Sequence, residues 1–405
     1  SSAASDVYKR QMCGIAGFCN FKEDFEENTD YWNFRLEKMR AVLAHRGNDA
    51  RGRYLKKHIG LSHSRLAIRD ILCGDQPMTR THNGYDYTIC YNGEIYNTDE
   101  LIPELSENGF VCSTTSDTEV ILYAYIHWGA DFVNRLNGIF AFAIWDAAKS
   151  RLLLYRDRVG VKPLFYAIRG DSLVFGSEPK ACFAHPAVKP ELDKQGLQEL
   201  LAIGPAHTSG LSLFKDLFEV LPGHFMIYSR DGLHDETYWE LTSREHTESY
   251  RDTVAHTRFL VEDAIKRQMV SDVPVCTFLS GGIDSSIVTA IAANYMNTRG
   301  KTLNTFSFDF KDNDRYFKAN AFQPERDLPY VNRMLEEYET AHSYLECDEN
   351  SLFKALFAAV DAKDMPGMTD VDSSLLYFCS LVSRKNKVAL TGECADEIFG
   401  GYPWS

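Results

Sequence analysis

Residues 273–286, VPVCTFLSGGIDSS, decide the fold of the second half of the chain. VPVCTFL is a continuous apolar run, as expected of a parallel strand that is buried on both faces. SSIVTAIAANYM follows with helical spacing, and strand-like LNTFSFDF, helical segments near 328–337 and 351–360, and the short run KVAL come after it. Strands that alternate with helices predict an α/β domain with a doubly wound parallel sheet.

The same stretch carries a candidate phosphate-binding loop. Gly281 and Gly282 lack the Cβ atoms that would keep phosphate oxygens from backbone N–H groups, and a helix start favours an anion. Asp284 can hold a metal ion on the phosphates. Hydroxyl donors stand at Ser280, Ser285 and Ser286. The G-K-[ST] ending of a Walker A loop is absent. The alternative is a tight turn with Asp284 or Ser285 as a helix cap.

A second loop follows KVAL, within ALTGECADEIFGGY. Ligands of open α/β sheets bind outside the carboxyl ends of the strands, so Thr391 and Gly392 are expected to face the same nucleotide as SGGIDSS. Asp396 and Glu397 add carboxylates for Mg²⁺, and Glu393 can act as a general base. The alternative is an acidic helix start that complements the helix dipole.

The first half, residues 12–232, is rich in strand-like runs bounded by turn residues: MCGIAGFCNF, HIGLSHSRLAI, YDYTICYNGEIY, GIFAFAIWD, RLLLYRD and SLVFGSE. Asn97-x-x-Glu100 and Ser116-x-x-Glu119 fit the capping box, and the second is predicted to open a helix that ends near Gly129. Strands with helices set among them predict a layered α+β domain. The polar stretch 240–250 is the predicted linker.

Cys13 directly follows Met12. Residues 1–11 (SSAASDVYKRQ) are polar and without periodicity, so we expect 1–12 to be a leader or a cloning scar. At a mature N-terminus the α-amine of Cys13, with a pKa of about 7.7–8.0, can take the thiol proton. The alternative is an ordinary cysteine that opens a strand.

Other polar residues of this half suit a zwitterionic amino acid. Arg65 fits a carboxylate, and Glu94 and Asp117 can pair with an α-ammonium group. The Asn92 amide and the Gly93 N–H suit an oxyanion. The alternatives are surface charges at Arg65 and Asp117, and a hairpin turn at Asn92–Gly93.

Together these motifs resemble a known family. Cys13, HSRLAIRD, YNGEIYN and TTSDTEV, with AHRGND, NGIFAFAIWD, RDRVGVKPLFY and FGSEPKA, resemble the class II glutamine amidotransferases, which are N-terminal-nucleophile hydrolases. SGGIDSS resembles the pyrophosphatase loop of enzymes that cleave ATP between its α and β phosphates. With TGECADEIFGGY it is similar to the synthetase half of the glutamine-hydrolysing asparagine synthetases. The resemblance runs from Met12 to the end of the chain.

The resemblance implies a four-layer αββα sandwich over 13–239, followed by an ATP-pyrophosphatase domain over 251–405. It implies glutamine hydrolysis at Cys13 and ATP-dependent conversion of aspartate to asparagine through β-aspartyl-AMP, with ATP and Mg²⁺ as cofactors. Asp284 and Asp396 would bind Mg²⁺-pyrophosphate, and Glu393 would assist formation or aminolysis of the acyl-adenylate. The residues implied to line the nucleotide are Phe278, Leu279, Phe308, Thr391 and Gly392.

The chain departs from the family pattern in places. Cys394 stands where the family has glycine, and Asn48 replaces the proline of HRGPD. The family continues past GGYPW with helices and a basic residue that help activate the acceptor, so we expect a truncated chain and a poor synthetase. Two alternatives stay open: another carboxylate acceptor, such as a sugar-linked or antibiotic-pathway one, and a non-catalytic relic. MPGMTDVDSSLLYFCS lies where the family recognises its acceptor.

Composition excludes several classes of partner. A net charge of -14 disfavours a nucleic-acid surface, and no apolar run approaches the roughly 18 residues of a membrane helix. The 10 cysteines are scattered without a C-x-x-C pair, and the N-terminus lacks a secretory signal. We therefore expect a reduced, cytoplasmic protein that binds glutamine, aspartate and ATP, and we allow for a homodimer.

Overall fold

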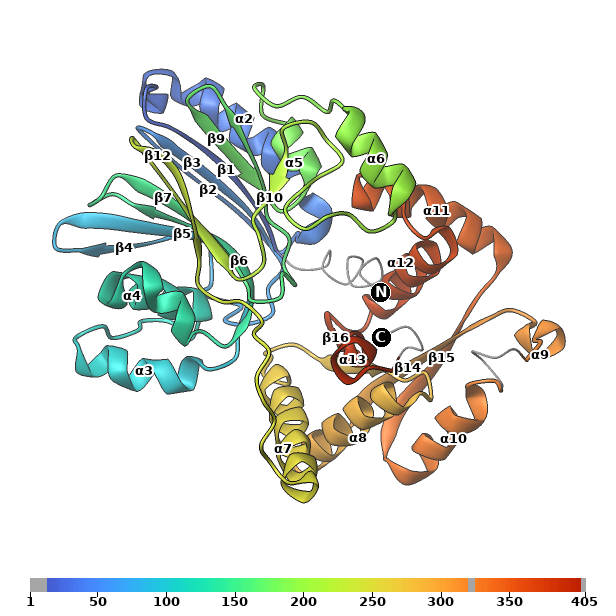
Figure 1. The fold of residues 1–405 in the computed structure, drawn as a ribbon. Coiled ribbons are helices and arrows are strands. Elements are labelled where there is room, and N and C mark those ends of the chain that lie inside the picture. Colours follow the sequence, from blue (N-terminus) through green and yellow to red (C-terminus); the bar gives the residue numbers. More distant parts are fainter. Residues whose placement is uncertain (1–12, 320–324, 402–405) are drawn as a thin grey trace. The chain divides into compact units, whose positions relative to one another are not determined.

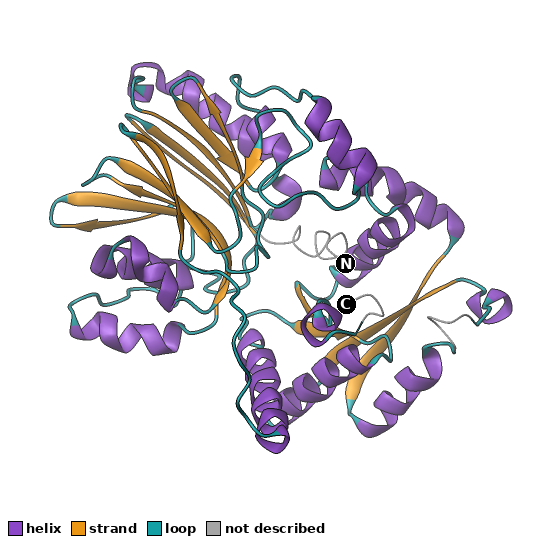
Figure 2. Ribbon diagram, viewed as in Figure 1, coloured by secondary structure: helices purple, strands orange, loops and turns teal. Residues whose placement is uncertain are grey.

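The computed structural model describes residues 13–319 and 325–401 (Figures 1 and 2). Its contacts divide the chain into two compact units. The first contains the described residues up to Thr242 together with Ala362–Gly367, and the second contains Ser243–Asp361 and the residues from Met368 onward. None of the described helices combines the length and the apolar character that a membrane span needs.

The first unit holds two six-stranded antiparallel sheets. One has the strand order β10-β8-β9-β1-β3-β2, and the other has the order β12-β11-β7-β6-β5-β4. The strands of the first sheet are β1 (Gly14–Asn20), β2 (Ala50–Lys56), β3 (Ile59–Arg65), β8 (Phe165–Arg169), β9 (Ser172–Gly176) and β10 (Phe218–Glu219). Those of the second are β4 (Met78–His82), β5 (Tyr85–Ile95), β6 (Gly138–Asp146), β7 (Arg151–Arg156), β11 (His224–Ser229) and β12 (Gly232–Thr237).

Alternation along the strands builds four layers. On β1, Ile15 faces the core between the two sheets, whereas Ala16 and Phe18 face the core under α2 (Thr29–Ala41) and α5 (Pro179–Phe183). On β6, Ala141 lies between the sheets, whereas Phe142 faces the core under α3 (Thr98–Glu107) and α4 (Asp117–Trp128). Figure 1 shows these two helix pairs beside their sheets. The αββα sandwich implied by the sequence is confirmed.

The two predicted capping boxes differ in outcome. Ser116 caps α4 by accepting from Thr118 N, and the helix ends at Gly129 with φ 75°, as predicted. The Glu119 half of the predicted box does not form, because Glu119 accepts from Ser113 and Thr114 while Ser116 N donates to Thr114. Asn97 also occupies the position before α3, but its side chain makes no capping bond there. Its Oδ1 accepts from Asn137 N at 2.9 Å and its Nδ2 donates to Arg135 O at 2.9 Å, so the capping box predicted at Asn97 is wrong.

The second unit contains a four-stranded parallel sheet in the order β15-β14-β13-β16. Its strands are β13 (Val275–Phe278), β14 (Leu303–Phe310), β15 (Thr340–Cys347) and β16 (Val388–Leu390). Its helices are α7 (Tyr250–Gln268), α8 (Ile283–Asn297), α9 (Asn313–Tyr316), α10 (Leu328–Glu337), α11 (Glu349–Lys363), α12 (Thr369–Val382) and α13 (Ala395–Phe399). The order runs outward from β13 in both directions, which confirms the predicted doubly wound sheet and places its switch point between β13 and β16.

Candidate active sites

The first candidate site is a cavity in the first unit, around Cys13. Because β1 and β3 pair antiparallel, with Gly14 opposite Ser64, the start of β1 adjoins Arg65 at the end of β3. Strand β5 and the first turn of α4 complete the cavity. Its lining includes Cys13, Arg65, Leu66, Arg69, Gln76, Tyr91, Gly93, Glu94, Ser116 and Asp117. Of the predicted glutamine-site residues, all except Asn92 are among those that line it.

The thiol of Cys13 is held by the backbone of Leu66. Its Sγ accepts from Leu66 N at 3.3 Å and lies 3.5 Å from Leu66 O. Burial raises the pKa of the Cys13 thiol to about 11, and the nearby Glu94 carboxylate also raises it. A thiol with this pKa is protonated at neutral pH, so it needs a base before it can act as a nucleophile.

Asn92 and Gly93 lie inside β5, opposite Ala141 and Phe140 of β6. The hairpin-turn alternative for this pair is therefore wrong. Asn92 is fully buried, and within the described chain neither its Nδ2 nor its Oδ1 has a hydrogen-bond partner. A Cβ added at Gly93 would lie 2.3 Å from Ile139 O, so the tight approach of β6 excludes a side chain there.

Arg65 is buried rather than a surface charge, and its guanidinium holds the loop that follows β3. Nη1 donates to Ile71 O at 3.2 Å and to Asp75 Oδ1 at 3.1 Å, and Nη2 donates to Asp70 O at 2.5 Å. Part of its hydrogen-bonding capacity is thus used to shape the rim of the cavity.

Asp117 is also buried, which rules out the surface-charge alternative. Its Oδ2 accepts from Tyr91 OH at 2.8 Å and from Ile95 N at 3.1 Å. Burial raises the pKa of the Asp117 carboxyl, and the neighbouring Arg69 cation opposes that shift. A buried carboxylate beside the cavity suits a cationic ligand group.

Two charged residues near Cys13, Arg46 and Glu178, were not among the predicted site residues. Arg46 Nε donates to Cys13 O at 3.2 Å, and Arg46 Nη1 lies 2.8 Å from Glu178 Oε1. Arg46 lies in AHRGND and Glu178 in FGSEPKA. These segments entered the sequence analysis only as part of the resemblance to the class II glutamine amidotransferases. A single charged residue in a loop gives no sign that it is buried, so its partner could not be predicted.

The second candidate site lies at the switch point of the parallel sheet, within the second unit. The loop that follows β13 turns into α8 with Gly282 as the N-cap residue. Asp284 and Ser285 lie in the first helical turn, so the alternative that one of them caps the helix is wrong. Gly281 has φ 85°, and a Cβ there would lie 2.8 Å from Asp327 O. The Ser285 hydroxyl accepts from Ser280 N at 3.2 Å and closes the loop on itself.

The loop after β16 touches the loop after β13. A Cβ added at Gly392 would lie 2.7 Å from Asp284 Cβ and 2.8 Å from Ser285 N. Burial raises the pKa of Asp284, and the Asp396 carboxylate raises it further. The Asp396 carboxylate is thus close enough to Asp284 to act on it electrostatically, and a cation shared by the two stays a prediction. Two carboxylates with substrate phosphates are a usual donor set for Mg²⁺. No group of three or more His, Cys, Asp or Glu able to hold a metal ion occurs in the parts of the chain described.

Glu393 and Cys394 follow in the same loop. Both are exposed; partial loss of solvent around the Glu393 carboxyl raises its pKa, and Glu397 adds to the shift. Cys394 has φ 70°, a left-handed conformation that favours glycine, and it precedes α13. The position occupied by glycine in the family pattern thus keeps a glycine-like backbone here.

Aromatic rings gather where β13 and β14 end. Phe308 stacks on Phe378 of α12 with centroids 4.1 Å apart, and it meets Phe278 edge-on at 5.0 Å. Leu279 is buried beside them. The lining of a nucleotide by Phe278, Leu279 and Phe308 stays a prediction.

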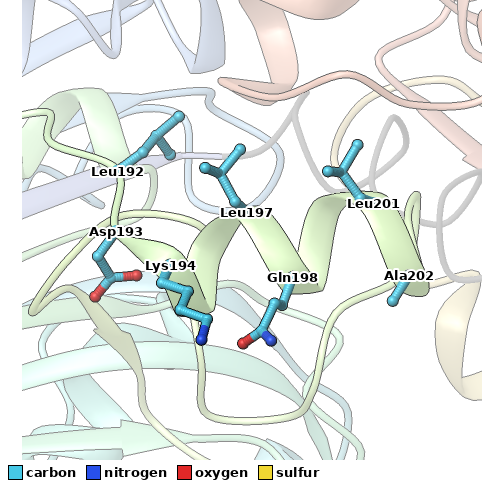
Figure 3. Close-up of a pocket in the computed structure, with 7 residues that line it drawn as sticks. All are labelled: Leu192, Asp193, Lys194, Leu197, Gln198, Leu201 and Ala202. Carbon is cyan, nitrogen blue, oxygen red and sulfur yellow. The ribbon is translucent and has the colours of Figure 1, made fainter.

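A separate hollow lies on α6 (Lys194–Ala202) of the first unit. Figure 3 shows Leu192, Leu197 and Leu201 on one side of this helix. Asp193, the carboxylate in the lining, caps α6 by accepting from Gly196 N at 2.8 Å. The lining of this hollow contains no cysteine, serine or histidine, and the hollow belongs to neither candidate site.

Comparisons with known proteins relate each of the two units to a protein family. The glutamine amidotransferase domain model matches residues 12–239, and the asparagine synthase model matches residues 256–405. Asparagine synthetase [glutamine-hydrolyzing] 3 of Bacillus subtilis is 48% identical over 97% of this chain and 64% of its own length. A putative asparagine synthetase of Methanocaldococcus jannaschii is 32% identical over 96% of this chain and 76% of its own. Amidase chyE of Penicillium rubens is 32% identical over 96% of this chain and 59% of its own.

The chain thus spans a little under two thirds of the B. subtilis relative. Both family models match in the order in which the two units follow along the chain, and each matched range contains one candidate site. This chain belongs to the family of the glutamine-hydrolysing asparagine synthetases.

Proposed function

We propose that this chain hydrolyses glutamine at Cys13 and uses the ammonia to amidate aspartate that ATP has activated, giving asparagine. The observation that carries the proposal is that one chain of this family holds both a cysteine-centred cavity and two touching loops at the switch point of a parallel sheet. The proposal concerns the reaction to which these two sites contribute.

In the glutamine half, the Cys13 thiolate attacks the amide carbonyl and forms a thioester, which water then hydrolyses to glutamate. The α-amine of Cys13, free after cleavage behind Met12, takes the thiol proton and passes it to the leaving ammonia. The Asn92 amide and the Gly93 N–H stabilise the oxyanion. The buried amide of Asn92 without a partner supports this role, since an unsatisfied buried polar group costs about 1–3 kcal/mol that a ligand can offset. Arg65, Glu94 and Asp117 bind the charged end of glutamine.

In the ATP half, the backbone N–H groups of Gly281 and Gly282 and the start of α8 bind phosphate oxygens. Asp284 and Asp396 would hold Mg²⁺, which would offset the charge of the departing pyrophosphate. The aspartate side-chain carboxylate attacks the α phosphate and displaces pyrophosphate, and ammonia then displaces AMP. Glu393 lies beside these residues in sequence and is the candidate base for the amine proton.

The test is pyrophosphate release against a panel of carboxylic acids, with glutamine or ammonium as nitrogen source. The chain should begin at Cys13 and be extended to the length of its relatives. Aspartate should give one asparagine per pyrophosphate from either nitrogen source, and Cys13→Ala should abolish only the glutamine-dependent reaction. No aspartate-dependent pyrophosphate release would contradict the proposal.

A second candidate function keeps the same chemistry but another carboxylate acceptor. It is favoured by the 32% identity to a relative named as an amidase, which is the same identity as to the M. jannaschii relative. Pyrophosphate release with another acid of the panel, and none with aspartate, would select it. If no acid of the panel causes pyrophosphate release and glutamine gives no glutamate, the chain would be a non-catalytic relic.

A further inference from the structure

The buried carboxylate of Glu178 is surrounded by three basic side chains in the first unit. Arg46 Nη1 lies 2.8 Å from Oε1, His45 Nε2 lies 3.0 Å from the carboxylate, and Lys180 Nζ lies 3.4 Å from Oε2. We call these four residues the Glu178 cluster. Lys180 is shared with Asp364, at 3.1 Å, which groups with the same unit.

Arg46 connects this cluster to the proposed nucleophile. It is almost fully buried, with 1% of its surface exposed, and it spans from Glu178 to the carbonyl of Cys13, which Nε reaches at 3.2 Å. Cys13 lies before the first residue pair of the β1–β3 ladder, Gly14 with Ser64, so the ladder itself does not fix its carbonyl.

The turn that carries Glu178 also holds the next part of the strand. Ser177 Oγ accepts from Ile15 N at 3.0 Å, and Ser177 N donates to Ile15 O at 2.9 Å. Ser177 and Glu178 thus anchor β1 at both sides of Gly14, one directly and one through Arg46. None of these groups lines the Cys13 cavity.

We propose that Glu178 is a positioning residue for glutamine hydrolysis: it holds Arg46 where the guanidinium fixes the Cys13 backbone, and with it the thiol and the α-amine. This inference rests on the proposed function, in which Cys13 is the nucleophile. A buried cation that loses a carboxylate at 2.8 Å moves or takes up water, since removing one partner of a buried ion pair is strongly unfavourable. A misplacement of about 1 Å at a nucleophile costs roughly a hundredfold in rate.

The same unit contains a matched control. Glu219 is likewise buried and is paired with Arg156 Nη1 at 2.7 Å and with His207 Nε2 at 3.1 Å. The Arg and His partners hold the pKa of both carboxyls below the usual range, to about 2 for Glu219. These contacts of Glu219 with Arg156 and His207 do not involve Cys13. Glu219→Ala therefore removes a comparable buried ion pair, and destabilises the unit, without removing a contact to Cys13.

The test uses the whole chain processed to begin at Cys13, as wild type, Glu178→Ala, Glu178→Gln and Glu219→Ala. Glutamate release gives kcat and KM for glutamine, thermal unfolding gives the stability, and intact mass gives the rate at which an electrophilic glutamine analogue labels Cys13. Glu178→Ala should lower kcat and the labelling rate about a hundredfold and leave KM within about threefold. Glu178→Gln keeps an acceptor for Arg46 and should recover to within about tenfold of wild type.

Glu219→Ala should lower the unfolding temperature as much as Glu178→Ala and keep kcat per folded molecule. If the wild type hydrolyses glutamine and Glu178→Ala keeps the wild-type kcat, the positioning role is overturned. An equal fall in kcat for Glu178→Ala and Glu219→Ala would also overturn it, because it would show a general loss of folding. A wild type that releases no glutamate would instead overturn the proposed function.

Discussion

Cys394 places a side chain on backbone that glycine tolerates best, with φ 70° before α13. A left-handed conformation costs an L-residue with a Cβ roughly 1–2 kcal/mol. Cys394→Gly should therefore raise the free energy of unfolding of the second unit by about 1 kcal/mol, measured by urea denaturation. Cys394→Ala keeps the Cβ and removes only the thiol, so it should bring no gain. An equal gain from both changes would show that the thiol, not the backbone, is unfavourable.

Gly281 combines a left-handed φ of 85° with close packing, since a Cβ would lie 2.8 Å from Asp327 O and 2.9 Å from Tyr330 Cβ. Gly281→Val should distort the loop after β13 and abolish Mg-ATP binding, measured by isothermal titration. Gly282 has φ -67°, and a Cβ there would meet only Ser280 Oγ, at 3.4 Å. Gly282→Ala is therefore a control for the fold of the loop alone, because Gly282 is itself a proposed phosphate-binding residue. Unchanged affinity in folded Gly281→Val would remove the loop from the nucleotide site.

At the scale of elements, the rim of the Cys13 cavity depends on two buried charges from different segments, Arg65 on β3 and Asp117 on α4. Loss of one charge of a desolvated pair costs about 2–5 kcal/mol, so Arg65→Ala or Asp117→Ala should raise the glutamine KM at least about thirtyfold. Asp75→Ala is the control, since that carboxylate is 76% exposed and its pair with Arg65 contributes little. Ammonia-dependent synthesis should survive all three changes. A parallel loss of both activities would contradict the binding role.

Hydrophobic periodicity and turn residues predicted helices and strands best where the local conformational preference agrees with the packing of the folded chain. Gly138–Asp146, Leu303–Phe310 and Leu328–Glu337 were predicted within a residue or two. The elements that were missed include strands β2, β4, β8, β11, β12 and β15 and helices α2, α5, α6 and α12. Strand β12 pairs only with β11 and is mostly exposed, so burial leaves little apolar alternation in its sequence. At Asn97 the local capping preference lost to hydrogen bonds with a segment 40 residues away, and such a partner cannot be predicted from spacing.

The whole chain adds an arrangement that no single element specifies. The predicted loops SGGIDSS and TGECADE are separated by over a hundred residues, and they meet because the strand order puts β16 beside β13. The sequence could predict parallel strands and loops at their ends, but the order of the strands depends on packing. The Glu178 cluster is a further case, since Arg46 and Glu178 lie 132 positions apart and pair only in the folded unit.

The largest consequence at this scale comes from the 12 residues before Cys13. In the uncut chain the nitrogen of Cys13 is an amide without useful basicity, and burial raises the pKa of the thiol to about 11. Roughly one thiol in a thousand is then ionised at pH 8, and the fraction rises tenfold per pH unit until pH approaches 11. Alkylation of Cys13 by iodoacetamide should follow this slope, and the uncut chain should release no glutamate from glutamine.

Cleavage between Met12 and Cys13 supplies the α-amine, so Cys13 of the cut chain should react at least about tenfold faster at pH 8 and glutaminase activity should appear. Peptide mapping by mass spectrometry measures both alkylation rates. The exposed Cys73 is the internal control, and its rate should be the same in both forms. Cys13→Ala in the cut chain should remain without glutaminase activity. Full glutaminase activity from protein whose intact mass still includes SSAASDVYKRQM would exclude the N-terminal-nucleophile mechanism, because the only base that the mechanism uses would be blocked.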